Sequence, residues 1–250
     1  MNEDFEAQAK AWRDERITKI NDHVTPVPLP NNRYLVLHIM PSENINFDNQ
    51  AEKLRMYFQV HNGSIVASNN FDGVILNLKK DKPLYTQFFR AGGIECISPL
   101  DTYNIVEYEE NDDYQDEKVT ISTISMDDCI QKLRTNTLNY IRGVYNCTGL
   151  EKNSYFVSVS FLNVKGHSAT LKKGEGHMGR EHTAKIPYLN LQFKEIIIDK
   201  MPETLLKAPV QATPTDWYNY TEALLPIIKH MVAVTGSPTN NEDINFLFKD

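Results

Sequence analysis

Two long runs of β-branched and aromatic residues, at 154–164 (SYFVSVSFLNV) and 188–198 (YLNLQFKEIII), most constrain the fold of this chain. Such residues favour β-strands because their side chains pack well on a pleated surface. The segment between them, Lys165 to Lys185, is rich in glycine, histidine and basic residues. We therefore expect two strands of one packed sheet, joined by a long basic loop.

The first half of the chain predicts a helix followed by an antiparallel meander. Apolar residues at helical spacing over 3–20 indicate an amphipathic helix with Arg16 on a solvent-facing side. A strand over 33–40 has two apolar faces, and we interpret His38 on it as a structural histidine. Residues 54–60 fit either a short strand or a helical turn. The meander that follows has connections too short for the crossovers of a parallel sheet, and its strands are 71–79, 84–90 and 94–98.

The second half predicts two further helices. Ser125 is placed to cap a long central helix, with carboxylates in its first turn. Thr213 is placed to cap a C-terminal helix, in which Pro214 occupies the first position and Pro226 introduces a kink. The expected fold class is α+β, with an antiparallel sheet in one piece or in two parts. We expect a single domain over 1–250, or two subdomains: a helix plus β-meander over 1–120, and a helix, a hairpin with a long basic loop and a last helix over 121–250.

Composition limits the cellular setting and the partners. No apolar run approaches the ~18 residues that a membrane span needs, and the N-terminus does not resemble a secretory signal. Three widely spaced cysteines are typical of reduced thiols, which favours a cytoplasmic location. The net charge of −7 disfavours general nucleic-acid binding. The oligomeric state stays open.

Basic residues gather locally despite the acidic total. The loop between the two strand-like runs carries five candidate contact residues: Lys165, Lys172, Lys173, Arg180 and Lys185. Neighbouring aromatic residues on the strands favour base stacking, although strand aromatics are more often part of the core. The leading hypothesis is therefore a non-catalytic binding or sensing module, without a cofactor, that contacts a protein partner or nucleic acid through residues 165–185.

The sequence offers weaker support for dinucleotide binding or for catalysis in this region. Residues 174–179 match the G-x-G-x-x-G pattern, but a strand follows them where a dinucleotide site needs a helix. Gln192 and Lys194 resemble half of a metal-dependent nuclease site, which would need carboxylates to hold the cation. The rival hypothesis is thus a nuclease or nucleotide-processing enzyme with a divalent metal, whose candidate ligands are Glu175, His177, Glu181 and His182.

Four stretches, in order, are similar to a known bacterial arrangement: 12–29, 33–41, 85–95 and 157–166 followed by 186–198. Together they resemble the C-terminal region of bacterial proteins that carry an N-terminal AlbA-type, Schlafen-like DNA-binding domain and are often described as ATP-binding. The Schlafen-like domain itself has no counterpart here, so no functional residue carries over. The resemblance implies an accessory or sensing region of a bacterial cytosolic protein in regulation or defence, either free-standing or part of a longer chain.

Overall fold

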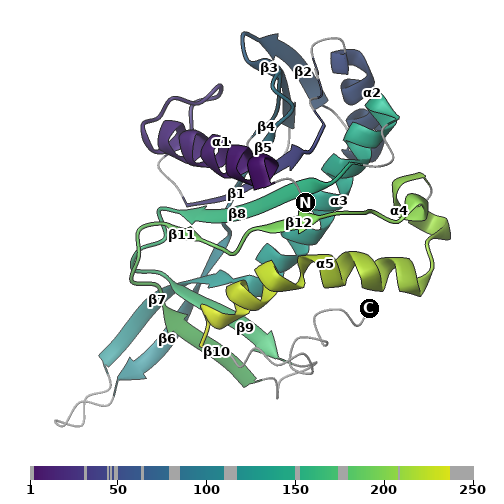
Figure 1. The fold of residues 1–250 in the computed structure, drawn as a ribbon. Coiled ribbons are helices and arrows are strands. Elements are labelled where there is room, and N and C mark those ends of the chain that lie inside the picture. The colour runs from purple at the N-terminus through teal and green to yellow at the C-terminus, as the bar shows by residue number, and fades with distance from the viewer. Residues whose placement is uncertain are drawn as a thin grey trace.

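The computed structural model of this chain confirms the α+β class: helices pack around two β-sheets, A and B (Figure 1). Both sheets combine strands from before and after residue 120. The described residues are 3–30, 33–43, 45, 47, 50–62, 65–78, 85–109, 117–149, 153–173, 180–207 and 209–236.

Sheet A has eight strands in the order β11-β8-β1-β5-β4-β3-β2, while β12 also pairs with β8. Each of these neighbours is antiparallel, and for the meander strands β3, β4 and β5 the short connections predicted this. The strands are β1 (Tyr34–Pro41), β2 (Ile65–Asn70), β3 (Gly73–Leu78), β4 (Tyr85–Phe89), β5 (Ile94–Pro99), β8 (Tyr155–Leu162), β11 (Leu191–Gln192) and β12 (Ile196–Ile198).

Sheet B has four strands in the order β10-β9-β7-β6. Two antiparallel hairpins build it, and they meet where β7 and β9 run parallel, so the sheet is mixed. Its strands are β6 (Thr102–Glu109), β7 (Glu117–Ser125), β9 (Ser168–Lys173) and β10 (Arg180–Lys185).

Helices cover both faces of sheet A. The strand β1 alternates between them: Leu35 and Leu37 join the main core with the long central helix, whereas Tyr34 and Val36 join a smaller cluster with Ile20 of the first helix. Because both faces are covered, nearly every side chain of β1 is buried. The helices are α1 (Glu3–Asn21), α2 (Ala51–Asn62), α3 (Met126–Thr148), α4 (Glu203–Lys207) and α5 (Pro214–Ala233), with a 3₁₀ turn at Pro209–Gln211.

The predicted helix caps are confirmed. The Ser125 side chain accepts a hydrogen bond from the Asp128 backbone at 3.3 Å, and α3 ends at Gly149, whose φ is 70°. Thr213 and Asp216 form a reciprocal capping box at the start of α5, and Pro226 lies inside that helix. No helix in the described part of the chain is long and apolar enough to cross a membrane.

Residues 54–60 are helical and belong to α2, which is one of the two predicted alternatives. Two other local predictions were wrong. Segment 188–198 is not one strand, because its chain leaves β8 between β11 and β12. Ile196 and Ile198 on β12 are buried. The long loop at 165–185 is largely a hairpin, β9 and β10, in which Ala169 and Leu171 are buried.

Candidate functional site

Two segments distant in sequence lie side by side where sheets A and B meet. The turn after β8 and the segment between β10 and β11 are joined by backbone hydrogen bonds: Val164 N–H to Leu189 O at 2.8 Å, and Ile186 N–H to His167 O at 2.8 Å. In addition, the Asn163 N–H donates to the side-chain oxygen of Asn190 at 3.1 Å. These bonds hold residues 163–167 against 186–190.

This junction buries two apolar anchor residues and exposes a cationic, aromatic edge. Val164 and Ile186 are buried and anchor the two segments. Lys165 and Lys185 are exposed beside them. Tyr188 is 63% exposed, so its ring is open to a stacking partner.

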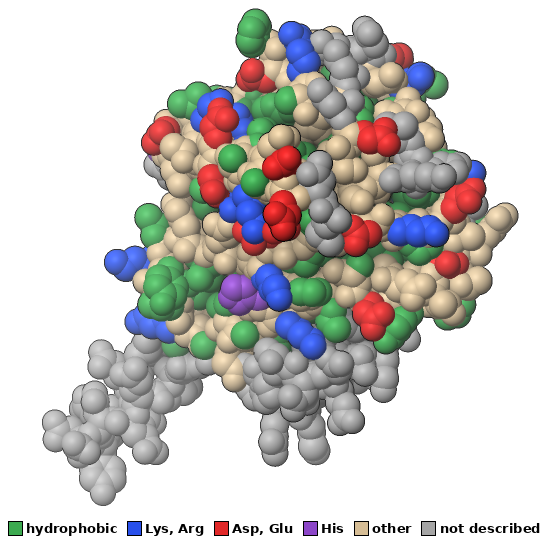
Figure 2. Space-filling model, viewed as in Figure 1, with side chains coloured by type: hydrophobic (Ala, Val, Ile, Leu, Met, Phe, Trp, Pro, Cys, Tyr) green, Lys and Arg blue, Asp and Glu red, His purple; other side chains and the backbone are tan. Residues whose placement is uncertain are grey.

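The C-terminal end of α5 extends the same surface. The Lys194 backbone N–H donates to Nδ1 of His230 at 3.0 Å, and the His230 ring packs edge-on against the buried Phe193, with centroids 5.6 Å apart. The Lys194 and His230 side chains are exposed. In Figure 2 a histidine lies near the middle of the view, with Lys or Arg side chains beside and below it and acidic side chains above it. We call this surface the cationic face; it comprises Lys165, Lys185, Tyr188, Leu189, Lys194 and His230.

A further cation lies close to this junction. Arg33, at the entrance to β1, places Nη1 3.2 Å from the ring nitrogens of His167 and 3.3 Å from the Ser122 hydroxyl. Burial and the neighbouring Arg33 charge lower the pKa of His167. His167 is therefore neutral at pH 7, and Arg33 supplies the positive charge of this pair.

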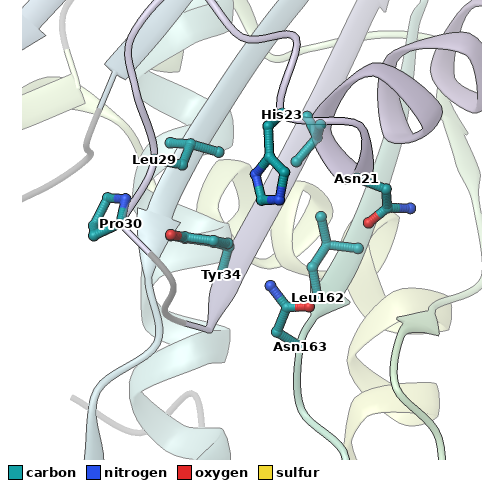
Figure 3. Close-up of a pocket in the computed structure, with 8 residues that line it drawn as sticks. Asn21, His23, Leu29, Pro30, Tyr34, Leu162 and Asn163 are labelled. Atoms are coloured by element: carbon teal, nitrogen blue, oxygen red, sulfur yellow. The ribbon is translucent and has the colours of Figure 1, made fainter.

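A small cleft opens next to the junction, at the end of α1 (Figure 3). Its volume is about 80 Å³. In Figure 3 the His23 ring lies over the centre of the cleft, with Leu29 and Tyr34 on one side, Asn21 on the other and Asn163 below. Among the described residues, the lining comprises Ile20, Asn21, His23, Leu29, Pro30, Tyr34, Leu162 and Asn163.

The sequence-predicted contact residues are only partly located. Lys165 and Lys185 lie on the cationic face, at the base of the β9–β10 hairpin. Lys172 and Lys173 fall on β9, and Arg180 on β10 opposite Lys173; the orientations of these three side chains lie outside what the structure describes. Lys194, a residue of the alternative nuclease site, also lies on the cationic face.

The alternative metal and nuclease residues are distributed as follows. Glu175 and His177 lie outside the described residues, while Glu181 and His182 stand on β10 opposite Lys172 and Leu171. The described part of the chain holds no group of three His, Cys, Asp or Glu side chains placed to bind a metal ion.

Gln192 does not contribute to a metal-binding group of this kind. Its Nε2 donates to Oε1 of Glu195 at 3.1 Å. Glu195 is also paired with Arg13 of α1. Burial of Glu195 opposes its ionisation, but the hydrogen bonds from Arg13 and the backbone, together with the charges of Arg13 and Lys10, outweigh burial and lower its pKa. This carboxylate therefore ties α1 to the segment between β11 and β12.

The most densely bonded polar group, Glu95 on β5, was not predicted. It is fully buried beneath α1 and accepts hydrogen bonds from Arg16 at 2.9 and 3.0 Å and from Tyr85 at 2.6 Å. The His38 ring lies 3.0 Å away. Since Arg16 is only 5% exposed, its predicted solvent position was wrong. The cluster has no opening to solvent and fixes α1 to sheet A, which is a structural role.

Comparison with protein-family models, with curated protein sequences and with solved structures finds no match to this chain.

Proposed function

We propose that this chain is a non-catalytic binding module that holds single-stranded nucleic acid on the cationic face. The observation that carries the proposal is the placement of exposed lysines around an exposed tyrosine at the rigid junction of the two sheets. Non-sequence-specific single-strand binding uses this combination, because cations follow the phosphates while aromatic rings stack on bases.

The site's rigidity supports this use. Backbone hydrogen bonds fix the segments that carry Lys165, Lys185 and Tyr188. Lys194 is held through its own backbone by His230. A preorganised surface loses less conformational entropy on binding than a flexible loop does, so a few contacts suffice for measurable affinity.

The acidic total charge is compatible with a local polyanion site. Exposed charges farther apart than about 8 Å are largely screened at physiological ionic strength, so the cationic face acts mainly through its own residues. The net charge of −7 would repel polyanions elsewhere on the surface and thereby confine them to this face.

The setting follows from the sequence resemblance. An accessory or sensing region of a bacterial, Schlafen-related regulatory or defence protein would meet nucleic acid in the cytoplasm. The three cysteines are free and buried, which accords with a reducing compartment.

The test compares wild type with a triple-reversal variant, Lys165→Glu, Lys185→Glu and Lys194→Glu, by fluorescence anisotropy with a labelled 16-nucleotide oligo-dT. We expect the variant to bind at least 10-fold more weakly. A matched control is Lys207→Glu, a charge reversal on α4 at the opposite end of the molecule from β11 (Figure 1), which should bind like wild type.

Two other results would replace the proposal. Binding to an acidic peptide but not to oligo-dT would identify a protein partner as the ligand. Cleavage of the oligonucleotide in Mg²⁺ or Mn²⁺, lost in Lys194→Ala, would favour the nuclease hypothesis.

A further inference from the structure

We infer that the cleft beside His23 accepts one pyrimidine ring of the bound strand. The inference rests on the proposed function and names the part of the ligand that the cationic face does not contact.

Backbone strain points to this cleft. Among the described residues, His23 and Asn163 are the two non-glycine residues with positive φ, each at 60°, and both line it. Such conformations cost free energy and collect at functional sites. Asparagine adopts positive φ readily, so His23 is the informative residue of the two.

Of these two residues, His23 is the more unusual for its position in the chain. His23 N–H bonds Ile20 O at 3.1 Å and Val24 N–H bonds Lys19 O at 2.8 Å, which is the Schellman pattern that ends a helix. His23 occupies the left-handed position of that motif, where glycine is the usual residue because it has no Cβ. Histidine is therefore unfavourable for the helix end, yet it places an imidazole over the cleft.

The lining matches an uncharged ring. Ile20, Tyr34 and Leu162 are buried members of an apolar cluster and form the walls beneath His23. No Lys or Arg is among the described lining residues, so a phosphate would find no counter-charge from them. The amides of Asn21 and Asn163 stand at the rim, where they can meet the polar edge of a base.

The volume of the cleft distinguishes a single-ring pyrimidine from a two-ring purine. A cavity of roughly 150 Å³ encloses benzene. At about 80 Å³ the cleft covers one ring partially and cannot enclose a purine. A pyrimidine would enter with its edge and one face, and its sugar would remain in solvent.

The cleft continues into the cationic face. Asn163 is bonded to Asn190, and the next residue, Val164, is bonded to Leu189. Lys165 follows directly. A strand whose phosphates contact Lys165 and Lys185 can therefore place one base at the cleft within the reach of a single nucleotide.

The first experiment uses uridine, which has no phosphate and so probes the cleft without the cationic face. In NMR titrations we expect uridine to shift the His23 ring signals saturably, both in wild type and in the triple-reversal variant. The absence of any shift in wild type would overturn the inference, whether or not oligo-dT binds.

The second experiment compares an eight-nucleotide oligo-dT with an abasic strand of the same length. In His23→Gly we expect about 5- to 100-fold weaker oligo-dT binding, the range for losing one stacked base, and unchanged abasic binding. Glycine suits the helix end, so the melting temperature should stay equal or rise. His23→Asn also tolerates positive φ and should give the same loss. Unchanged oligo-dT binding, or equal losses for both strands, would contradict the inference while leaving the proposed function standing.

Discussion

His38 and Glu95 face each other on the neighbouring strands β1 and β5, with Nε2 and Oε2 3.0 Å apart in full burial. Arg16 reaches the same carboxylate from α1, and the Arg16 guanidinium lies 4.5 Å from the centre of the Phe89 ring. Through Arg16, Glu95 thus anchors α1 to sheet A. The C-terminal end of α1 forms one wall of the cleft.

Replacing the carboxylate should be severely destabilising. Glu95→Gln leaves the Arg16 charge buried without a counter-charge, which typically costs about 3–5 kcal/mol. Urea unfolding measures the change in the free energy of unfolding. As a control, Glu15→Gln removes an exposed pair with Lys19 and should cost less than about 1 kcal/mol. Equal small losses for the two variants would refute the anchoring role.

Acid should weaken the wild-type protein through the same group. Burial alone would raise the pKa of Glu95, but hydrogen bonds and charges from His38 and Arg16 lower it to about 2. Because the unfolded-state pKa is higher, this stabilisation is complete above pH ~4.5 and is lost as the pH falls toward 2. Unfolding free energies measured between pH 5 and 2.5 should fall less steeply in Glu95→Gln. An unchanged slope would contradict this assignment.

Gly93 should tolerate no larger side chain. A Cβ there would lie 2.4 Å from the Trp12 indole, which packs edge-on against His38 and Phe89. Gly93→Ala should therefore displace the ring and cost about 1–3 kcal/mol. In a Trp217→Phe background, tryptophan emission should shift toward red as Trp12 becomes more exposed. A double-mutant cycle with Trp12→Ala checks the cause. If Gly93→Ala lowers the free energy of unfolding equally in the Trp12→Ala background, the clash with the indole is not the cause.

Arg33 should control the titration of His167. Since the Arg33 charge is one of the two causes that lower the pKa of His167, Arg33→Gln should move that pKa upward, toward ~6.5. NMR titration of the His167 ring measures it. Burial remains in the variant, so the recovery should be partial. A pKa that does not rise would mean that burial alone sets it.

Local signals in the sequence predicted correctly the helices that begin with a capping side chain. Ser125 and Thr213 cap α3 and α5 as predicted, because capping needs only residues within one turn. The strand β1 was found from its own alternation. The class of fold follows from these elements and their short connections.

Two of the errors share a physical cause: the deciding partner is distant in the chain. The chain departs from the direction of β11 at Lys194, whose backbone N–H donates to His230, 36 residues away. Arg16 was placed toward solvent, since nothing near it marks Glu95, 79 residues on, as its partner. The cleft likewise joins residues around 21–34 to 162–163. Its one local signal was a histidine, rather than glycine, at a helix end.

The salt dependence of oligo-dT binding tests the central claim most directly. Each phosphate neutralised on a single strand contributes about 0.7 to the slope of log K against log salt. Removing three cations from the cationic face should therefore reduce the slope by about 2 between wild type and the triple-reversal variant. Parallel lines for the two proteins over 50–200 mM NaCl would show that the cationic face does not hold the strand.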